Sequence, residues 1–255
     1  MMLDLLWWAG LAWFAFWTAL PLALSFLLGP ALGLLAWPLL APWTALWGIS
    51  LVHRLLPESK PGSFRLFADP GAIRWALKGW APSLYLTVFQ PLFFMSPGFQ
   101  RLALRAFQAR LGPGSLLTSR TVVREPHRIT IGCGTLVGEY AHLIGSYQPR
   151  PGLLLVADIV IGDRVLVGAY GQIGPGARIG SGTILEHEVR VGAFATIGPD
   201  CRIGAGTAIY NSVRIGPGAR IGKRCLIAKN VVIPPGARIP DGTVLPNDSA
   251  REAAA

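Results

Sequence analysis

A repeat of six residues runs through the C-terminal half of the chain and restricts its fold more than any other feature. From residue 155 to residue 245, every sixth residue is Ile, Leu or Val. These residues are Leu155, Ile161, Val167, Ile173, Ile179, Leu185, Val191, Ile197, Ile203, Ile209, Ile215, Ile221, Ile227, Ile233, Ile239 and Leu245. On an α-helix, a step of six residues would scatter these side chains over several faces, so the repeat excludes a helix.

A solenoid of short strands accounts for the repeat. Each hexad supplies one strand with its aliphatic side chain inward, and a small residue fits near the following corner. Glycine follows the aliphatic residue in nine hexads and allows the backbone to turn. Three hexads close one triangular coil, and stacked coils bury a continuous core. The same phase continues backward through Ile131, Val137 and Leu143. We therefore predict a mainly β fold, with a parallel β-helix over residues 119–250 and a short tail over residues 251–255.

The N-terminal part of the chain has a different composition. Charged residues and histidines are absent from Leu5 to Val52, a stretch longer than the roughly 20 residues that cross a bilayer once. Gly29-Pro30 divides the stretch, so we expect helices near residues 4–28 and 31–53. They would form a transmembrane or re-entrant α-helical hairpin over residues 1–55. Arg54 and Lys60 follow it and predict that both ends face the cytoplasm.

A basic segment connects the two parts. Residues 54–128 hold 11 Lys or Arg and three acids, which accounts for most of the net charge of +10. Such charge favours contact with anionic lipid head groups. The uncharged run from Trp80 to Gln100 is interrupted by prolines and is expected at the membrane interface. We interpret residues 56–118 as a basic, helical, membrane-interfacial linker. The basic residues are scattered and accompany no nucleic-acid motif, so no nucleic-acid partner is predicted.

The hexads themselves resemble a known family. Segments such as IGDRVL, IGPGAR, IGSGTI, IGAGTA and IGKRCL are similar to those of the hexapeptide-repeat acyltransferases, and the resemblance covers residues 131–250. It implies a left-handed β-helix, a homotrimer with active sites between subunits, and acyl transfer with acetyl-CoA as cosubstrate. Together with the predicted anchor, it points to the bacterial inner membrane, with the repeat domain in the cytoplasm. The acceptor would be a hydroxyl or amine of a lipid-linked sugar or envelope component.

Residues 145–153, GSYQPRPGL, keep the six-residue spacing, but Pro149 stands where the repeat would have an aliphatic residue. We therefore expect a loop that leaves the coil. In colanic-acid-type and xenobiotic-type acetyltransferases, a similar loop carries a general-base histidine, and its position resembles Tyr147. Tyrosine, with an ordinary pKa of about 10, is a poor base at neutral pH. We therefore expect the base to be His142, with Glu139 orienting its imidazole, or else His187.

Three basic residues are candidates for donor binding. The segment IGKRCLIAKNVVIPPGA over residues 221–237 resembles the family segment along which CoA lies. The resemblance implies that Lys223, Arg224 and Lys229 meet the phosphates of CoA by charge. The alternative interpretation is that they are solvated corner residues. No CxxC or HExxH motif is present, and the histidine spacings do not match a three-histidine site, so no metal is predicted.

Two further hypotheses remain open at this point. One is a catalytically inactive β-helix scaffold at the membrane, which the missing loop histidine favours. The other is an amide-forming domain, because a similar layout occurs in membrane-bound poly-lysine synthetases, where membrane helices alternate with repeat domains. Binding of CoA separates the scaffold from both catalytic hypotheses.

Overall fold

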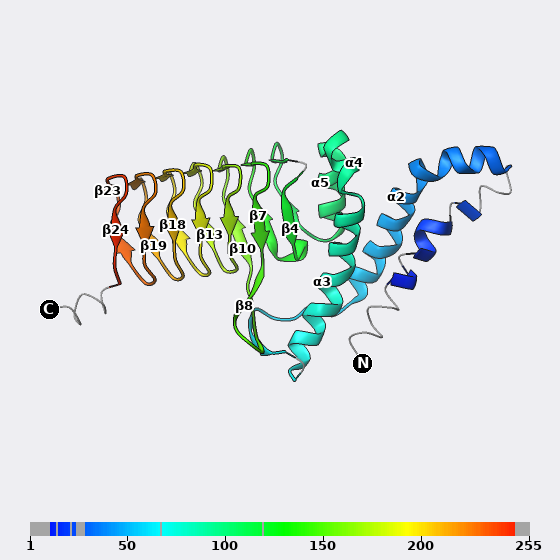
Figure 1. Cartoon of the computed structure of the whole chain (residues 1–255), viewed down its shortest axis with the longest axis horizontal. Coiled ribbons are helices and arrows are strands. Elements are labelled where there is room, and N and C mark those ends of the chain that lie inside the picture. The colour runs from blue at the N-terminus through cyan, green and yellow to red at the C-terminus, as the bar shows by residue number, and fades with distance from the viewer. Residues whose placement is uncertain are drawn as a thin grey trace.

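The computed structural model describes residues 11–13, 15–20, 22–23, 29–66, 68–118 and 120–247. Figure 1 shows a helical region at one end and a long solenoid of short strands at the other. The solenoid confirms the mainly β, parallel fold predicted from the six-residue repeat, and it is consistent with a left-handed β-helix.

Four helices with defined bounds make up the helical region. They are α2 (Pro30–Leu55), α3 (Pro70–Val88), α4 (Gln90–Met95) and α5 (Pro97–Ala106). Each has a proline in its first turn, where the missing N–H would have no partner within the helix. Tyr85 on α3 is fully buried, and its hydroxyl donates to the carbonyl of Pro42 on α2 at 2.9 Å. This hydrogen bond joins the two long helices.

In the part of the chain that the structure describes, no helix combines the length and the apolar character needed to cross a bilayer. The transmembrane hairpin predicted for residues 1–55 is therefore unsupported by these residues. The second helix expected there, near residues 31–53, is present as α2. The first helix was expected near residues 4–28, and residues 4–10 and 24–28 lie outside the described residues.

The solenoid consists of three parallel sheets of seven strands each. The first face contains β2 (Arg110–Leu111), β5 (Ile129–Ile131), β10 (Ile159–Ile161), β13 (Arg178–Ile179), β16 (Thr196–Ile197), β19 (Arg214–Ile215) and β22 (Val232–Ile233). The second face contains β3 (Leu116–Leu117), β6 (Leu136–Val137), β11 (Leu166–Val167), β14 (Ile184–Leu185), β17 (Arg202–Ile203), β20 (Arg220–Ile221) and β23 (Arg238–Ile239). The third face contains β4 (Val122–Arg124), β7 (His142–Ile144), β12 (Gln172–Ile173), β15 (Arg190–Val191), β18 (Ala208–Ile209), β21 (Leu226–Ile227) and β24 (Val244–Leu245).

One aliphatic residue per strand fills the core of the solenoid. Ile179, Ile197 and Ile215 lie in register on neighbouring strands of the first face, and all three are buried. Their neighbour Thr196 points outward and is exposed. At Gly162, a Cβ atom would lie 2.6 Å from the backbone nitrogen of Ser181 in the next coil, so only glycine fits there. Inward and outward positions thus follow the predicted phase.

The solenoid begins at β2, before the boundary expected at residue 119. Helix α5 packs on this first coil, and the guanidinium of Arg101 donates to the carbonyl of Gly112 at 2.6 Å. Arg105 likewise donates to the carbonyl of Leu111 at 2.6 Å. Helix α5 ends at Ala106, and these two arginines bind backbone carbonyls of the first coil.

The predicted loop at residues 145–153 leaves the coil as a β-hairpin. Strands β8 (Ser146–Arg150) and β9 (Leu153–Val156) pair antiparallel, and β1 (Gly62–Arg65) from the linker adds a third strand beside β9. Leu155, which the repeat placed in the solenoid core, instead lies in β9 opposite Tyr147. Its neighbours Leu154 and Val156 are the buried residues and pack with Ala72 of α3. The hairpin is therefore held by the linker as well as by the coil.

Candidate active site

A cavity of about 480 Å³ lies on the third face of the solenoid, beside the hairpin. Its lining comes from strands β4, β7, β8, β12, β15 and β18 and the corners that follow them. The lining residues are Arg124, His142, Ile144, Ser146, Tyr147, Gln172, Ile173, Gly174, Pro175, Arg190, Val191, Gly192, Ala193, Ala208, Ile209, Tyr210 and Asn211. Two residues of the predicted site, His142 and Tyr147, thus line one cavity.

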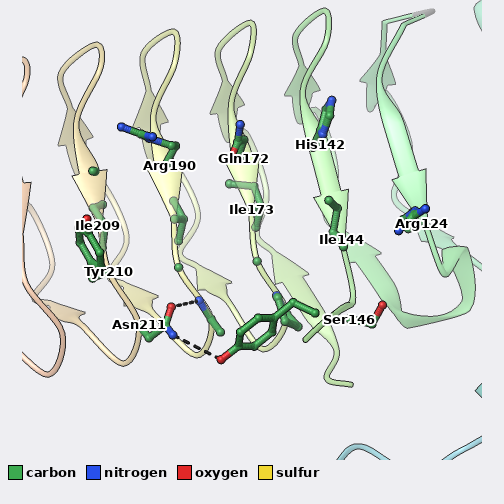
Figure 2. A pocket seen from close by; sticks show the side chains of 17 residues that line it. Arg124, His142, Ile144, Ser146, Gln172, Ile173, Arg190, Ile209, Tyr210 and Asn211 are labelled. Atoms are coloured by element: carbon green, nitrogen blue, oxygen red, sulfur yellow. Dashed lines mark hydrogen bonds between the residues drawn. The ribbon is translucent and has the colours of Figure 1, made fainter. Parts of the chain in front are cut away.

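Three polar side chains form a row across this face. His142, Gln172 and Arg190 occupy outward positions in register on the neighbouring strands β7, β12 and β15. Figure 2 shows them side by side on consecutive coils. Neighbouring strands lie about 4.8 Å apart, so a small group bound at His142 is also within reach of Gln172. His142 is partly exposed, and its imidazole has no hydrogen-bond partner among the described residues. The row can therefore both accept a proton and donate hydrogen bonds.

Tyr147 is held across the same cavity by the hairpin. Its hydroxyl oxygen accepts a hydrogen bond from Nδ2 of Asn211 at 3.4 Å, and Oδ1 of Asn211 accepts from the backbone nitrogen of Ala193 at 2.9 Å (Figure 2). Because the phenol accepts in this contact, its own proton is available to a bound molecule. This arrangement suits a positioning group better than a base.

A buried carboxylate that the sequence did not single out anchors the start of the hairpin. Glu125 accepts from the Ser146 hydroxyl at 2.7 Å, from the Gly145 backbone nitrogen at 3.1 Å and from Nε1 of Trp75 at 3.0 Å. Glu139, expected to orient His142, lies exposed at the corner before β7. No hydrogen bond joins Glu139 to His142 in the described chain.

His187 lies outside the cavity. It is exposed at the corner between β14 and β15, and the chain stacks there as the 18-residue coil predicts. The Glu188 nitrogen donates to the carbonyl of Ala169 at 2.8 Å, and the Gly206 nitrogen donates to the carbonyl of His187 at 3.0 Å. The neighbouring carboxylate of Glu186 is engaged elsewhere. It accepts from the guanidinium of Arg202 at 2.8 Å, and this hydrogen bond lowers the pKa of Glu186.

The three predicted donor-binding residues lie at the two ends of β21. Lys223 and Arg224 are exposed at the corner before β21, and Lys229 is exposed at the corner after it. The backbone nitrogen of Asn230 donates to the carbonyl of Asn211 at 3.1 Å, so Lys229 lies one coil beyond the rim of the cavity. Of the three, only Lys229 therefore lies at the same corner of the solenoid as Asn211. Lys223 and Arg224 lie at the same corner as His187, on a later coil.

The two remaining histidines lie at the junction of the helical region and the solenoid. The rings of His53 on α2 and His127, in the short 3-10 turn η2 (Pro126–Arg128), have centroids 5.3 Å apart. Burial lowers the pKa of His53 to about 4 and that of His127 to about 3, and the charge of Lys78 adds to both shifts. Over the described ranges, no group of three or more His, Cys, Asp and Glu side chains is arranged to hold a metal ion.

Sequence reasoning missed Gln172, Arg190, Asn211 and Arg124 as cavity residues. A signal for two of them was available, because the residue before each inward aliphatic must point outward. Gln172 and Arg190 are 18 residues apart, as one coil requires, but His142 and Gln172 are 30 apart because the hairpin intervenes. If the residues of the hairpin are left out of the residue count, His142, Gln172 and Arg190 fall at the same position of successive coils.

Comparisons with known proteins agree with the repeat. Residues 194–229 match the model of the bacterial transferase hexapeptide (six repeats). None of the curated proteins matches the sequence significantly. The solved structures to which the chain is similar include acyltransferases.

Three of these structures illustrate the similarity. A variant of AntD, an N-acyltransferase from Bacillus cereus in complex with dTDP-4-amino-4,6-dideoxyglucose and coenzyme A, is 15% identical, covers 52% of this chain and 80% of its own, and has a TM-score of 0.43. A hexapeptide-repeat-containing acetyltransferase from Vibrio cholerae is 17% identical, covers 63% and 85%, and has a TM-score of 0.40. The UDP-N-acetylglucosamine acyltransferase of Campylobacter jejuni is 16% identical, covers 55% and 63%, and has a TM-score of 0.34.

Proposed function

We propose that the protein transfers an acyl group, acetyl in the simplest case, from a CoA thioester to a hydroxyl or amine of a lipid-linked sugar or envelope component. The observation that carries the proposal is the row of His142, Gln172 and Arg190 inside a cavity of about 480 Å³. This volume suits a small substrate site. The row supplies a base beside two hydrogen-bond donors, and the hexapeptide match lies on the same solenoid.

In the proposed reaction His142 is the general base. Its neutral imidazole accepts the proton of the acceptor hydroxyl or amine as that atom bonds to the thioester carbonyl carbon. The carbon–sulfur bond then breaks, and CoA leaves as the thiol after taking up a proton from the imidazolium. Gln172 and Arg190 donate hydrogen bonds to the carbonyl oxygen while it carries negative charge. The Tyr147 hydroxyl, which accepts a hydrogen bond from Asn211, donates a hydrogen bond to the acceptor and positions it.

The donor is proposed to lie along the coils beyond the cavity. Lys229 is one coil from Asn211, and Lys223 and Arg224 flank the opposite end of β21. All three are exposed, so their charges are open to the phosphates of CoA. A homotrimer would complete the site in this proposal, because closed cyclic symmetry covers one flat face of each solenoid.

The proposed location is the bacterial inner membrane, with the solenoid on the cytoplasmic side. The helical region supports this location through the large apolar side chains that it leaves exposed. Trp43 is 52% exposed and Trp47 62% exposed, on the same helix as Leu55. Tryptophan is favoured at the boundary between lipid and water, and the basic residues that follow favour anionic lipid.

The test is transfer of label from acetyl-CoA with a ¹³C-labelled acetyl group. Full-length protein in detergent is mixed with a lipid extract of bacterial membranes, and the products are analysed by mass spectrometry. We expect label to appear in a lipid fraction together with free CoA, and we expect CoA to raise the midpoint of thermal unfolding. A protein that neither shifts with CoA nor transfers label would be the scaffold instead.

A further inference from the structure

The cation of Arg124 lies where three hollows of the surface meet. Arg124 is the last residue of β4 and is exposed, and its guanidinium has no hydrogen-bond or ion-pair partner among the described residues. It lines the cavity of the polar row, a second hollow of about 460 Å³ against α3, and a third of about 230 Å³ between α3, α5 and the first coil. Figure 2 shows Arg124 at the end of the third face, on the coil before His142.

The second hollow, which we call the helix-side hollow, follows one face of α3 and is mostly apolar. Its lining residues are Trp75, Ala76, Gly79, Trp80, Ser83, Leu84, Thr87, Arg124 and Glu125. From Trp75 to Thr87 the helix rises about 18 Å, at 1.5 Å per residue, which is long enough to lie along a hydrocarbon chain. The two indole rings and the small residues between them form a shallow apolar track. The acid at its end, Glu125, already accepts three hydrogen bonds and is buried.

The C-terminal part of α3, which forms one end of the track, packs on a helix that leaves large apolar side chains exposed. The hydrogen bond from Tyr85 to Pro42 holds the C-terminal part of α3 against α2. Leu40 and Trp43 on that part of α2 are about half exposed. A molecule whose chain occupies the track can therefore have its far end in a lipid layer.

The other end of the track leads to the polar row. In the pairing of β4 with β7, Arg124 lies opposite Ile144, and His142 is two residues earlier on β7. Residues in this diagonal relation have Cα atoms about 7–8 Å apart. A single sugar ring and its bond to a phosphate span such a gap. Arg124 and His142 are therefore placed to bind the two ends of one sugar phosphate.

We infer that Arg124 binds the phosphate of a lipid-phosphate-linked sugar, whose hydrocarbon chain occupies the helix-side hollow and whose sugar reaches His142. This inference rests on the proposed function, because it names the acceptor class of the same site. The guanidinium of Arg124 has no other partner, and a phosphate is an anion that complements its charge. A soluble nucleotide sugar has no chain for the apolar track, and a fatty chain without phosphate leaves the arginine unpaired.

The test measures binding rather than catalysis, so that it stands apart from the test of acyl transfer. Full-length protein is titrated with phosphatidylcholine vesicles that contain or lack 5% polyprenyl phosphate. We expect at least tenfold tighter binding to the vesicles with polyprenyl phosphate. Arg124→Gln should remove this preference, because a charge-assisted contact of this kind contributes about tenfold or more in affinity.

Gly79→Leu tests the track separately from the charge. A Cβ atom at Gly79 would make only an ordinary van der Waals contact, with Cγ of Glu125 at 3.8 Å, and because Gly79 lines the helix-side hollow we expect the rest of a leucine side chain to occupy it. Leucine also favours the helix more than glycine does. We expect the preference for polyprenyl phosphate to fall about tenfold. The control Gly98→Leu, on α5, adds the same side chain where the nearest atom, Oγ of Ser96, is 3.9 Å away, and it should keep the preference.

Arg178→Gln is the matched control for the charge, because Arg178 is an exposed arginine on the first face, away from the cavity. It should bind as the unmodified protein does. Equal binding to both kinds of vesicle, a preference that survives Arg124→Gln, or displacement of polyprenyl phosphate by micromolar dTDP would overturn the inference. A protein that binds polyprenyl phosphate through Arg124 but transfers no acetyl group would overturn the proposed function alone.

Discussion

The solenoid and the helical region bury their apolar side chains in different ways. In the solenoid, the place of a residue in its hexad decides its environment, so Ile197 is buried and Thr196 is exposed although they are neighbours. In the helical region, individual contacts between distant residues decide it, such as the hydrogen bond from Tyr85 to Pro42. A periodic core can be read from a sequence, whereas a core made of single long-range contacts requires the structure.

The two regions can be monitored separately in one sample. All nine tryptophans lie at or before Trp80, so tryptophan fluorescence reports only on the helical region and the linker. Circular dichroism in the β-sheet range reports mainly on the solenoid. A substitution that unfolds one region can therefore be distinguished from one that unfolds both.

The largest effect is expected from a charge inside the solenoid. Ile197→Asp places a carboxylate where no polar partner is available, at a cost of roughly 3 kcal/mol or more, and the stacked coils should lose their β signal. Thr196→Asp is the control, because the outward position lies between Arg178 and Arg214 in register. If Ile197→Asp kept a stable β signal, the inward assignment of the six-residue phase would be wrong.

The next effect concerns the junction between the regions. The guanidinium of Arg128 is buried and binds Asp158 at 2.8 Å, Glu58 at 3.5 Å and the carbonyl of Ser59. Arg128→Ala should cost about 2 kcal/mol, because it removes the charge-assisted hydrogen bonds of a buried guanidinium, whereas the carboxylates of Asp158 and Glu58 are half exposed to water. We expect the tryptophan transition to shift to lower denaturant while the β signal persists. Coincident loss of both signals would mean that the regions unfold as one unit.

The buried histidines predict a dependence of stability on pH at the junction of the helical region and the solenoid. Both have lowered pKa values, about 4 for His53 and about 3 for His127, so the folded state keeps them neutral. The unfolded chain takes up these protons below about pH 6.5, and stability is therefore present above that pH and is lost as the pH falls toward 4. At pH 5 the loss should be roughly 2 kcal/mol for each histidine.

The measurement is denaturant unfolding followed by tryptophan fluorescence at pH 7.5 and pH 5. His53→Phe should reduce the dependence, because an apolar ring does not titrate. An equal loss of stability in His53→Phe and the unmodified protein would show that other groups are responsible.

The smallest effect is expected in the hairpin, where the two regions meet through the pairing of β1 with β9. Tyr147→Phe removes the hydroxyl that accepts from Asn211 at 3.4 Å and leaves the ring in place. If Tyr147 only positions the acceptor, the rate of acyl transfer should fall tenfold or less. A fall of 10²–10⁴-fold, the range for loss of a general base, would contradict that role.

How much of the solenoid the sequence predicts depends on where insertions interrupt the six-residue repeat. The inward phase from Ile161 onward was predictable, since hexads stack without insertion. The first coil was missed because the turn η2 inserts two residues, so that Val123 and Ile131 are eight positions apart instead of six. The hairpin likewise shifts Leu155 out of the core.

The candidate site was predictable only in part. Tyr147 was found from the family resemblance and His142 from its place five residues before Tyr147, and both line the cavity. Arg124 and Glu125 were not, because their roles depend on α3, whose packing against the hairpin no local pattern indicates. His187 was proposed as the alternative base, but it lies at the corner between β14 and β15, outside the cavity.

The most direct test of the proposed function compares the acetyl-transfer rates of His142→Ala and His187→Ala. Both substitutions remove one histidine from the surface of the solenoid, and both proteins must first show equal thermal stability. Loss of the general base predicts a rate for His142→Ala that is 10²–10⁴-fold lower, with little change in His187→Ala. Full activity in His142→Ala would contradict the account, because the cavity contains no other histidine to accept the proton.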